Sequence, residues 1–162
     1  FAQQINFLNQ HPKIAVCGTP AILIDKFGKT IGRKLYPINI TSAILIRYNP
    51  IIHPTAMIRK SVLNKLGGYD ETLNGAEDYD LWLRVASRYP LANLSHKLLL
   101  YRVNPQGISW SSLKHTEWQA LKARLKAIRY YGYPWWQVVY LIKPTISFLI
   151  PVSVKKLLLN IS

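Results

Sequence analysis

The sequence predicts an α/β fold followed by a helical C-terminal tail. Helix and strand patterns alternate over residues 1–109, Gly and Pro separate these patterns, and residues 110–162 are helical in pattern. The chain has 162 residues, of which 49% are hydrophobic and 17% are charged. A chain of this length and composition can bury a hydrophobic core, so we expect a globular protein.

The N-terminal elements follow from apolar spacing and turn residues. Residues 1–10 show helical spacing, and His11 and Pro12 end that helix. We predict strands at residues 13–17, 21–25, 30–36 and 55–59, a hairpin turn at 26–29, and short helices that end at 46 and 66. Cys17 is the one cysteine, which excludes an intrachain disulfide, and we expect it to be a buried strand residue.

Acidic residues gather in one stretch of an otherwise basic chain. The net charge is +14, yet five of the seven acidic residues lie between Asp70 and Asp80. A helix that begins near Glu77 would place Asp78 at the centre of its apolar face. On the opposite side, which we expect to face solvent, Asp80 and Arg84 would form an i,i+4 ion pair. Asp78 therefore needs an explanation that Asp80 does not.

Two explanations of Asp78 are compatible with its position. It can be the N-cap of the helix, accepting the N–H groups of Asp80 or Leu81. Alternatively, a carboxylate beside a Gly-containing loop and Trp82 can accept a proton from a bound hydroxyl. Burial would raise the pKa of Asp78 and capping N–H groups would lower it, and the sequence leaves this balance open.

Four segments, considered together, resemble a known family: residues 53–63, 67–70, 76–82 and 101–102. Their order and spacing closely resemble the C-terminal half of family 2 glycosyltransferases, which have the GT-A fold. The resemblance implies that residues 1–109 are the C-terminal portion of a GT-A domain, a Rossmann-like nucleotide-diphospho-sugar transferase fold. Residues 110–162 would then be a basic, amphipathic helical tail.

The resemblance implies an inverting glycosyltransferase. Such an enzyme moves a sugar from a nucleotide-sugar donor to a hydroxyl of a saccharide or lipid-linked acceptor, in cell-surface polysaccharide or glycolipid biosynthesis. Asp78 would be the catalytic base, Glu77 would shape the pocket, and Trp82 would form an apolar wall for a sugar ring. His53 would border the same pocket, although a histidine in an apolar run is also a common structural hydrogen-bonding residue.

The resemblance also suggests how the donor is bound. Arg102 would clamp the diphosphate, with a solvent-exposed strand-end arginine as the alternative, and Asn104 stands where family members often carry His. A divalent metal, Mg²⁺ or Mn²⁺, would be held by an Asp-x-Asp motif preceding Phe1. The carboxylates of Asp78 and Asp80 should point apart, so we assign no metal ligand in this chain and expect the chain alone to be inactive.

The predicted tail combines cationic, aromatic and apolar side chains. A long helix at residues 110–131 would have an apolar stripe that includes Leu125 and a basic surface that includes Arg124. The apolar runs beyond it are interrupted at residues 143–144 and 151, and neither reaches the roughly 20 residues that span a bilayer. We expect this tail to lie in the membrane interface, at the cytoplasmic face of the plasma membrane. Its alternative role is to cover an intramolecular or dimer surface.

The net charge of +14 implies a polyanionic neighbour, which could be nucleic acid, an anionic membrane or phosphorylated substrates. We find no zinc-ligand set, helix-turn-helix signature or RNA-binding aromatic motif, so we expect no nucleic-acid partner. Two hypotheses compete with the enzyme: a non-catalytic basic module that binds membranes or nucleic acid, and a degenerate, truncated gene product.

Overall fold

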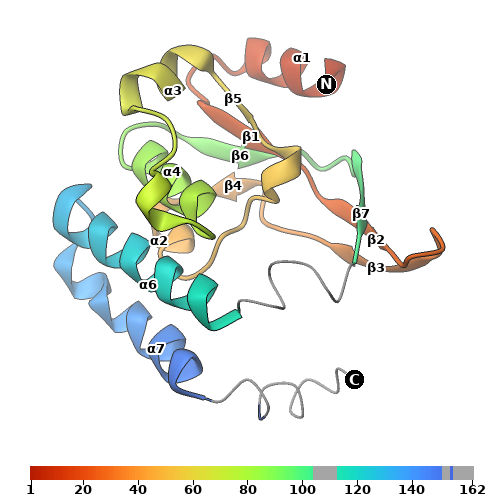
Figure 1. Ribbon diagram of the computed structural model, residues 1–162. Helices are drawn as coiled ribbons and strands as arrows, with labels where there is room; N and C mark the ends of the chain where they lie inside the picture. Colours follow the sequence, from red (N-terminus) through yellow and green to blue (C-terminus); the bar gives the residue numbers. More distant parts are fainter. Residues whose placement is uncertain (104–112, 151–153, 155–162) are drawn as a thin grey trace.

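The computed structural model describes residues 1–103, 113–150 and 154, in which helices and strands alternate (Figure 1). The α-helices of these residues are α1 (Ala2–Gln10), α2 (Ser42–Leu45), α3 (Lys60–Leu66), α4 (Glu77–Ala86), α6 (Leu113–Tyr130) and α7 (Ile142–Leu149). The 3₁₀ helices are η1 (His53–Thr55), η2 (Glu71–Leu73) and η3 (Trp135–Leu141). The strands are β1 (Val16–Gly18), β2 (Ala21–Ile24), β3 (Thr30–Lys34), β4 (Asn39–Ile40), β5 (Met57–Ile58), β6 (Leu91–Asn93) and β7 (Leu99–Arg102).

The strands form two mixed sheets, which confirms the predicted α/β class. The larger sheet has the order β4-β6-β1-β5, in which β1 is parallel to β6 and antiparallel to β5. The smaller sheet has the order β3-β2-β7, with β2 and β3 forming the predicted hairpin. The larger sheet lies between α1 and α4, so both of its faces are covered (Figure 1).

Alternation along β1 sends side chains into two hydrophobic clusters. Val16 belongs to the main core, which also contains the apolar residues of α4. Cys17 points to the other face, where it packs with Leu8 of α1 and Leu94. Cys17 is therefore the buried strand residue that we predicted, and burial raises the pKa of its thiol to about 11.

Turn residues act as the sequence predicted. Asp25 Oδ1 accepts the N–H groups of Phe27 and Lys29, both at 2.9 Å, and Gly28 has a φ of +88° at the hairpin tip. Gly67 ends α3 in the left-handed conformation, with a φ of +81°.

Other elements differ from their predicted form. The strand expected at residues 55–59 is reduced to Met57–Ile58, because the preceding residues form η1. Pro144, which we expected to interrupt the tail, lies in the first turn of α7, where a missing N–H breaks no helical bond. In α6, Arg124 is buried and Leu125 is 48% exposed, so the predicted positions of both residues were wrong.

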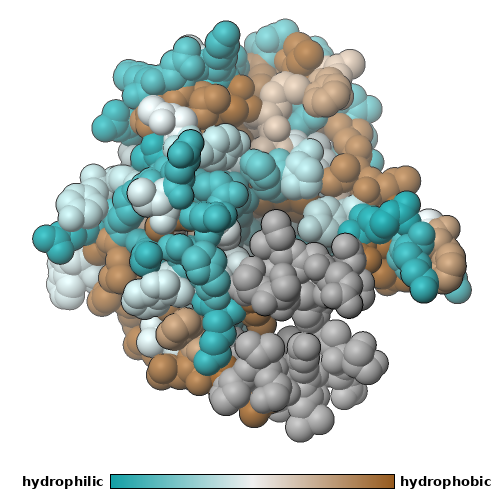
Figure 2. Space-filling model, viewed as in Figure 1, coloured by the Kyte–Doolittle hydropathy of each residue, from teal (hydrophilic) through white to brown (hydrophobic). Residues whose placement is uncertain are grey.

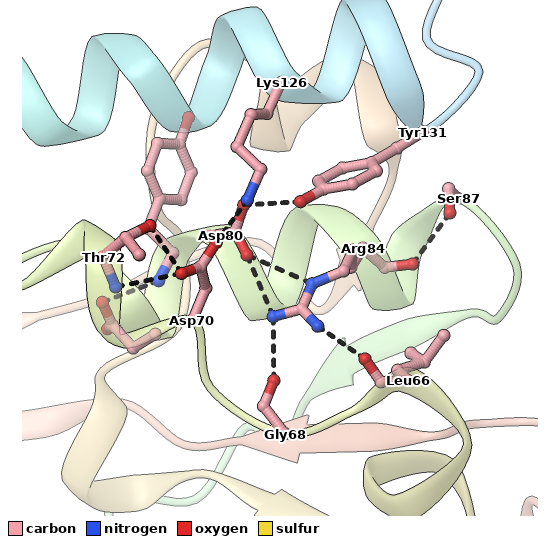
Figure 3. A network of polar contacts seen from close by, with 11 residues as sticks. Leu66, Gly68, Asp70, Thr72, Asp80, Arg84, Ser87, Lys126 and Tyr131 are labelled. Carbon is pink, nitrogen blue, oxygen red and sulfur yellow. Dashed lines mark hydrogen bonds and ion pairs between the residues drawn. The ribbon is translucent and has the colours of Figure 1, made fainter.

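The predicted solvent side of α4 is also wrong. The ion pair between Asp80 and Arg84 does form, at 2.9 Å, but Asp80 is completely buried. Helix α6 packs against this side of α4, which a helical wheel of α4 alone cannot show (Figure 3). The side that we expected to face solvent is therefore an interface between two helices.

Asp80 is the centre of a polar network that joins α4 to its neighbours (Figure 3). Its Oδ1 accepts a hydrogen bond of 2.8 Å from the Tyr131 hydroxyl and lies 3.6 Å from Lys126 Nζ. Lys126 also donates to Asp70, and Arg84 donates to two backbone carbonyls at the end of α3. The buried carboxylate is thus paired and hydrogen-bonded, as burial of a charge requires.

We expect Asp80→Ala to lower the free energy of unfolding by about 2–3 kcal/mol. Removing one partner of a fully buried ion pair costs roughly 3–5 kcal/mol, and solvent reaches part of both cations here. Urea denaturation measures the change. The control Glu71→Ala removes an exposed carboxylate and should change stability by less than about 0.5 kcal/mol. Equal effects of the two substitutions would contradict a structural role for Asp80.

Asp70 should make stability depend on pH in acid. The Lys126 ammonium and the Thr72 hydroxyl lower the pKa of Asp70 from 3.8 to about 2. A depressed carboxyl pKa stabilises the fold above the unfolded value and loses this effect as pH falls toward the folded value. Asp70→Asn should therefore cost about 1–2 kcal/mol above pH ~4 and almost nothing near pH ~2. Parallel stability curves for the two proteins, measured by urea denaturation, would contradict this assignment.

Candidate active site

Asp78 is the second residue of α4 and lies partly buried. Ala76 is the N-cap of this helix and makes no side-chain capping bond, while the N–H of Asp80 bonds to the Ala76 carbonyl. Asp78 Oδ1 instead accepts the N–H of Tyr79 at 2.7 Å. Of the two explanations of Asp78, the capping of Asp80 or Leu81 is therefore excluded, because Ala76 is the N-cap and Asp78 already lies inside the first turn of α4.

The second carboxylate oxygen of Asp78 is oriented by Asn49. Asn49 Nδ2 donates to Asp78 Oδ2 at 3.2 Å. Asn49 is itself fixed, because its Oδ1 accepts the N–H of Ile51 at 3.1 Å. Asn49 is not among the site residues that the sequence predicts, although an Asn whose side chain bonds the backbone two residues on is a rigid donor.

Burial determines the direction of the pKa shift of Asp78. Loss of solvent raises the pKa of this carboxyl above 3.8, and the neighbouring Glu77 carboxylate adds to the rise. The Tyr79 N–H, the His53 ring and the Asn49 amide favour the charged form but offset only part of the effect. The net effect, which the sequence left open, is therefore a raised pKa of Asp78.

His53 and Tyr69 form a hydrogen-bonded pair next to the acidic residues. His53 Nε2 lies 3.1 Å from the Tyr69 hydroxyl, and the two rings meet edge to face. Burial first, and then the charges of Asp78 and Glu77, raise the pKa of Tyr69. Tyr69 therefore lies within the electrostatic reach of both carboxylates. We did not predict it as a site residue, although it belongs to segment 67–70 of the family resemblance.

Glu77 borders a hollow beside this pair. Its Oε2 accepts the N–H of Gly75 at 2.6 Å, which holds the loop before α4 against the helix. The hollow has a volume of about 260 Å³ and is lined by Tyr69, Glu71, Asn74 and Glu77. Oxygen and amide groups that surround such a hollow can hydrogen-bond the hydroxyls of a sugar.

Trp82 has a different position from the one predicted. Its side chain is completely buried in the main core, so it offers no exposed face to a sugar ring. The indole lies 6.3 Å from the His53 ring, measured between centroids. Trp82 therefore supports His53 from the core side. The predicted apolar wall for a sugar ring is absent here because the side of α4 that carries Trp82 packs into the core.

Arg102 is engaged with the hairpin turn. Its Nη1 donates to the carbonyls of Asp25 and Lys26 at 2.7 and 2.8 Å, while the side chain as a whole remains exposed. Arg102 thus stabilises the hairpin turn in this structure. Asn104, the other predicted diphosphate residue, lies outside the described residues.

The described residues do not offer a metal site. The two carboxylates of the Asp78-Tyr79-Asp80 sequence have separate partners: Asp78 contacts Asn49, whereas Asp80 is enclosed by Arg84, Tyr131 and Lys126. In residues 1–103, 113–150 and 154, no three His, Cys, Asp or Glu side chains are grouped so that they could hold a metal ion. The described residues therefore do not fit a divalent cation.

Comparison with known proteins adds the family. A family model described as glycosyltransferase like family 2 matches residues 28–135, which is more than half of the chain. The chain belongs to this family. The matched range contains Asp78, Glu77, His53, Tyr69 and Asn49, so the candidate site lies within the family domain.

Curated proteins similar to the chain are named as glycosyltransferases. The chain is 30% identical to the amylovoran biosynthesis glycosyltransferase AmsE of Erwinia amylovora, over 98% of this chain and 60% of that protein. It is 38% identical to the O-antigen biosynthesis glycosyltransferase WbnJ of Escherichia coli, over 64% of this chain and 42% of that protein. The putative glycosyltransferase EpsE of Bacillus subtilis is 28% identical, over 94% and 55%. The chain spans about half the length of these family members.

We expect Asp78→Asn to stabilise the fold at neutral pH. A raised carboxyl pKa means that the native state holds its proton more tightly, so ionisation of Asp78 costs stability as pH rises through that pKa. The variant should gain stability relative to the parent at pH ~7, and this gain should disappear below pH ~4. Urea denaturation at both pH values checks the sign. A variant that is less stable at neutral pH would show that the charged carboxylate supports α4.

Proposed function

We propose that this chain is the acceptor-side portion of an inverting, nucleotide-sugar-dependent glycosyltransferase of GT-A fold, with Asp78 as its catalytic base. The observation that carries the proposal is the partly buried carboxylate of Asp78, with a raised pKa, inside the range matched by the family model. In this assignment residues 1–109 belong to the transferase domain and residues 110–162 to a helical tail.

The proposed reaction uses Asp78 in a single displacement. Its carboxylate takes the proton of an acceptor hydroxyl, and the resulting oxygen nucleophile forms a bond to the anomeric carbon of the donor sugar. The bond from that carbon to the nucleoside diphosphate breaks on the opposite face, which inverts the configuration. A raised pKa makes Asp78 a stronger base, and Asn49 keeps one of its oxygens in a fixed direction.

The acceptor binds, in this proposal, at the hollow beside α4. Glu77 and Tyr69 line this hollow, and the Tyr69 hydroxyl is hydrogen-bonded to His53 Nε2. Residues that fix a hydroxyl within reach of the base supply orientation, which is a large part of the acceleration of a two-substrate reaction. Trp82 contributes indirectly, because it packs beneath His53.

The proposed binding of the sugar-nucleotide donor is supported by family membership. Members of this family typically use a divalent metal, and we assign Mg²⁺ or Mn²⁺ to the whole protein with ligands outside the described residues. When bound, such an ion neutralises charge on the leaving diphosphate. Arg102 and Asn104 remain our proposed diphosphate contacts. Arg102 keeps donors other than its Nη1 group for this purpose.

The names of the relatives indicate a class of pathway. Two of them are named for amylovoran and O-antigen biosynthesis. We infer that this protein also acts in the synthesis of a cell-surface polysaccharide or glycolipid, with a saccharide or lipid-linked acceptor.

The tail is proposed to rest on the membrane surface. Large hydrophobic side chains of α6, η3 and α7 are 45–79% exposed, namely Trp118, Leu125, Trp135, Trp136, Val138, Val139, Ile142, Ile146 and Leu149. Figure 2 shows hydrophobic side chains gathered at the lower left, over these helices. No helix in the described parts of the chain has the length and hydrophobicity to cross a bilayer. From the exposed hydrophobic side chains and the basic charge of the chain, we propose peripheral attachment at the cytoplasmic face of the plasma membrane.

The test is nucleoside diphosphate release by the native-length protein with a panel of sugar nucleotides, Mg²⁺ or Mn²⁺, and membrane lipid extract as acceptor. Asp78→Asn should lower transfer by about 10²–10⁴-fold, the usual contribution of a general base. Asp25→Asn is the matched control, because Asn preserves the hairpin turn and Asp25 lies in the turn before β3.

The outcomes of the transfer assay distinguish the enzyme from its alternatives. Release that requires Asp78 and is unaffected by Asp25→Asn would support the mechanism and name the donor. Transfer that survives Asp78→Asn would remove Asp78 from the mechanism. Failure of every donor would favour a non-catalytic basic module over an enzyme.

A further inference from the structure

A second pocket lies between α2 and the tail and shares no lining residue with the hollow at α4. It has a volume of about 780 Å³, and its lining includes Arg47 and Tyr48 after α2, Tyr140 of η3, and Lys143 and Ser147 of α7. Two cationic and two aromatic side chains therefore surround one opening. The proposed transfer reaction uses none of these residues.

Arg47 is held in place by the tail. Its guanidinium stacks 4.4 Å from the centroid of the Tyr140 ring, and its Nη2 donates to the Tyr140 hydroxyl at 2.6 Å. An arginine fixed on an aromatic ring loses little side-chain entropy when it binds an anion. Its remaining N–H groups can form the paired hydrogen bonds that guanidinium makes with phosphate.

The cations around this pocket are not neutralised by nearby acids. A buried third cation, Arg124, donates to the carbonyls of Ile46 and Arg47 at 3.0 and 3.2 Å. In the described residues, no carboxylate forms an ion pair with Arg47, Arg124 or Lys143. Ser147 of the lining donates a hydrogen bond to the carboxylate of Glu117. The lining thus contains two cations, Arg47 and Lys143, and no carboxylate, which leaves an excess of positive charge.

We propose that this pocket binds the phosphate group of an anionic membrane lipid. The pocket shares η3 and α7 with the exposed hydrophobic surface of the tail, so a lipid whose chains contact that surface can place its phosphate between Arg47 and Lys143. Tyrosines at the opening suit the headgroup region of a bilayer. This inference rests on the membrane attachment proposed above and is independent of sugar transfer.

The test measures co-flotation of the native-length polypeptide with phosphatidylglycerol vesicles and with phosphatidylcholine vesicles, without any sugar nucleotide. The double variant R47Q/K143Q should bind phosphatidylglycerol vesicles at least about tenfold more weakly than the parent. The control K26Q/K29Q removes the same charge from the exposed hairpin turn, which lies on the other side of the molecule (Figure 1), and should change binding less than about twofold. Thermal melts check that the variants fold. We expect them to do so because the four substituted residues are exposed.

A third variant and a soluble ligand separate specific binding from diffuse attraction. Arg47→Lys keeps the charge but loses the planar donor pair, so it should weaken phosphatidylglycerol binding by about two- to fivefold. Equal losses in the pocket and hairpin variants would overturn the pocket and leave general charge as the cause. Inorganic pyrophosphate that binds through Arg47 and Lys143, with vesicle binding unchanged, would overturn the lipid as the source of the phosphate. A parent protein that binds neither kind of vesicle would instead refute the membrane attachment itself.

Discussion

The buried carboxylate of Asp80 determines how α4 is rotated about its axis. Because this charge is inaccessible to solvent, α4 must keep it against the cations and the hydroxyl supplied by Arg84, Lys126 and Tyr131. Two residues along a helix correspond to a rotation of about 200°, so fixing Asp80 toward α6 directs Asp78 away from α6. The candidate base therefore owes its direction to a structural ion network on the other side of its helix.

The two carboxylates show how similar residues acquire different properties on one helix. Asp80 is stabilised by opposite charges, whereas Asp78 has only neutral donors, the Asn49 amide and a backbone N–H, in direct contact. Neutral donors compensate part of the cost of burial, and the remaining cost appears as a raised pKa. A raised pKa without a structural pairing is typical of a group that exchanges protons in function. Asp80 thus serves stability, while the unpaired charge of Asp78 is consistent with its proposed role as the base.

Local signals in the sequence predicted the elements near this site, while long-range contacts decided its details. The Asp25 turn, the Gly67 helix end and the start of α4 depend on neighbouring residues, and each was predicted from them. The exposure of Asp80 was predicted wrongly because the covering helix α6 begins more than thirty residues later, and periodicity within α4 cannot reveal it. The pairing of His53 with Tyr69 likewise joins separate segments, so spacing could suggest each residue but not their contact.

Helix α6 connects the candidate active site with the proposed lipid pocket. Lys126 of α6 and Tyr131, just beyond the helix, contact Asp80. Arg124 of α6 donates to the carbonyls of Ile46 and Arg47, and Arg47 lines the pocket. These contacts also give part of the positive charge a structural role: Arg84 and Lys126 pair with Asp80, and Arg124 donates to a backbone carbonyl of another element. In the proposed membrane-bound state, one helix makes both sets of contacts, so the fold sets the distance between the proposed base and the membrane surface. An acceptor attached to a lipid would then meet Asp78 at a defined height above the bilayer.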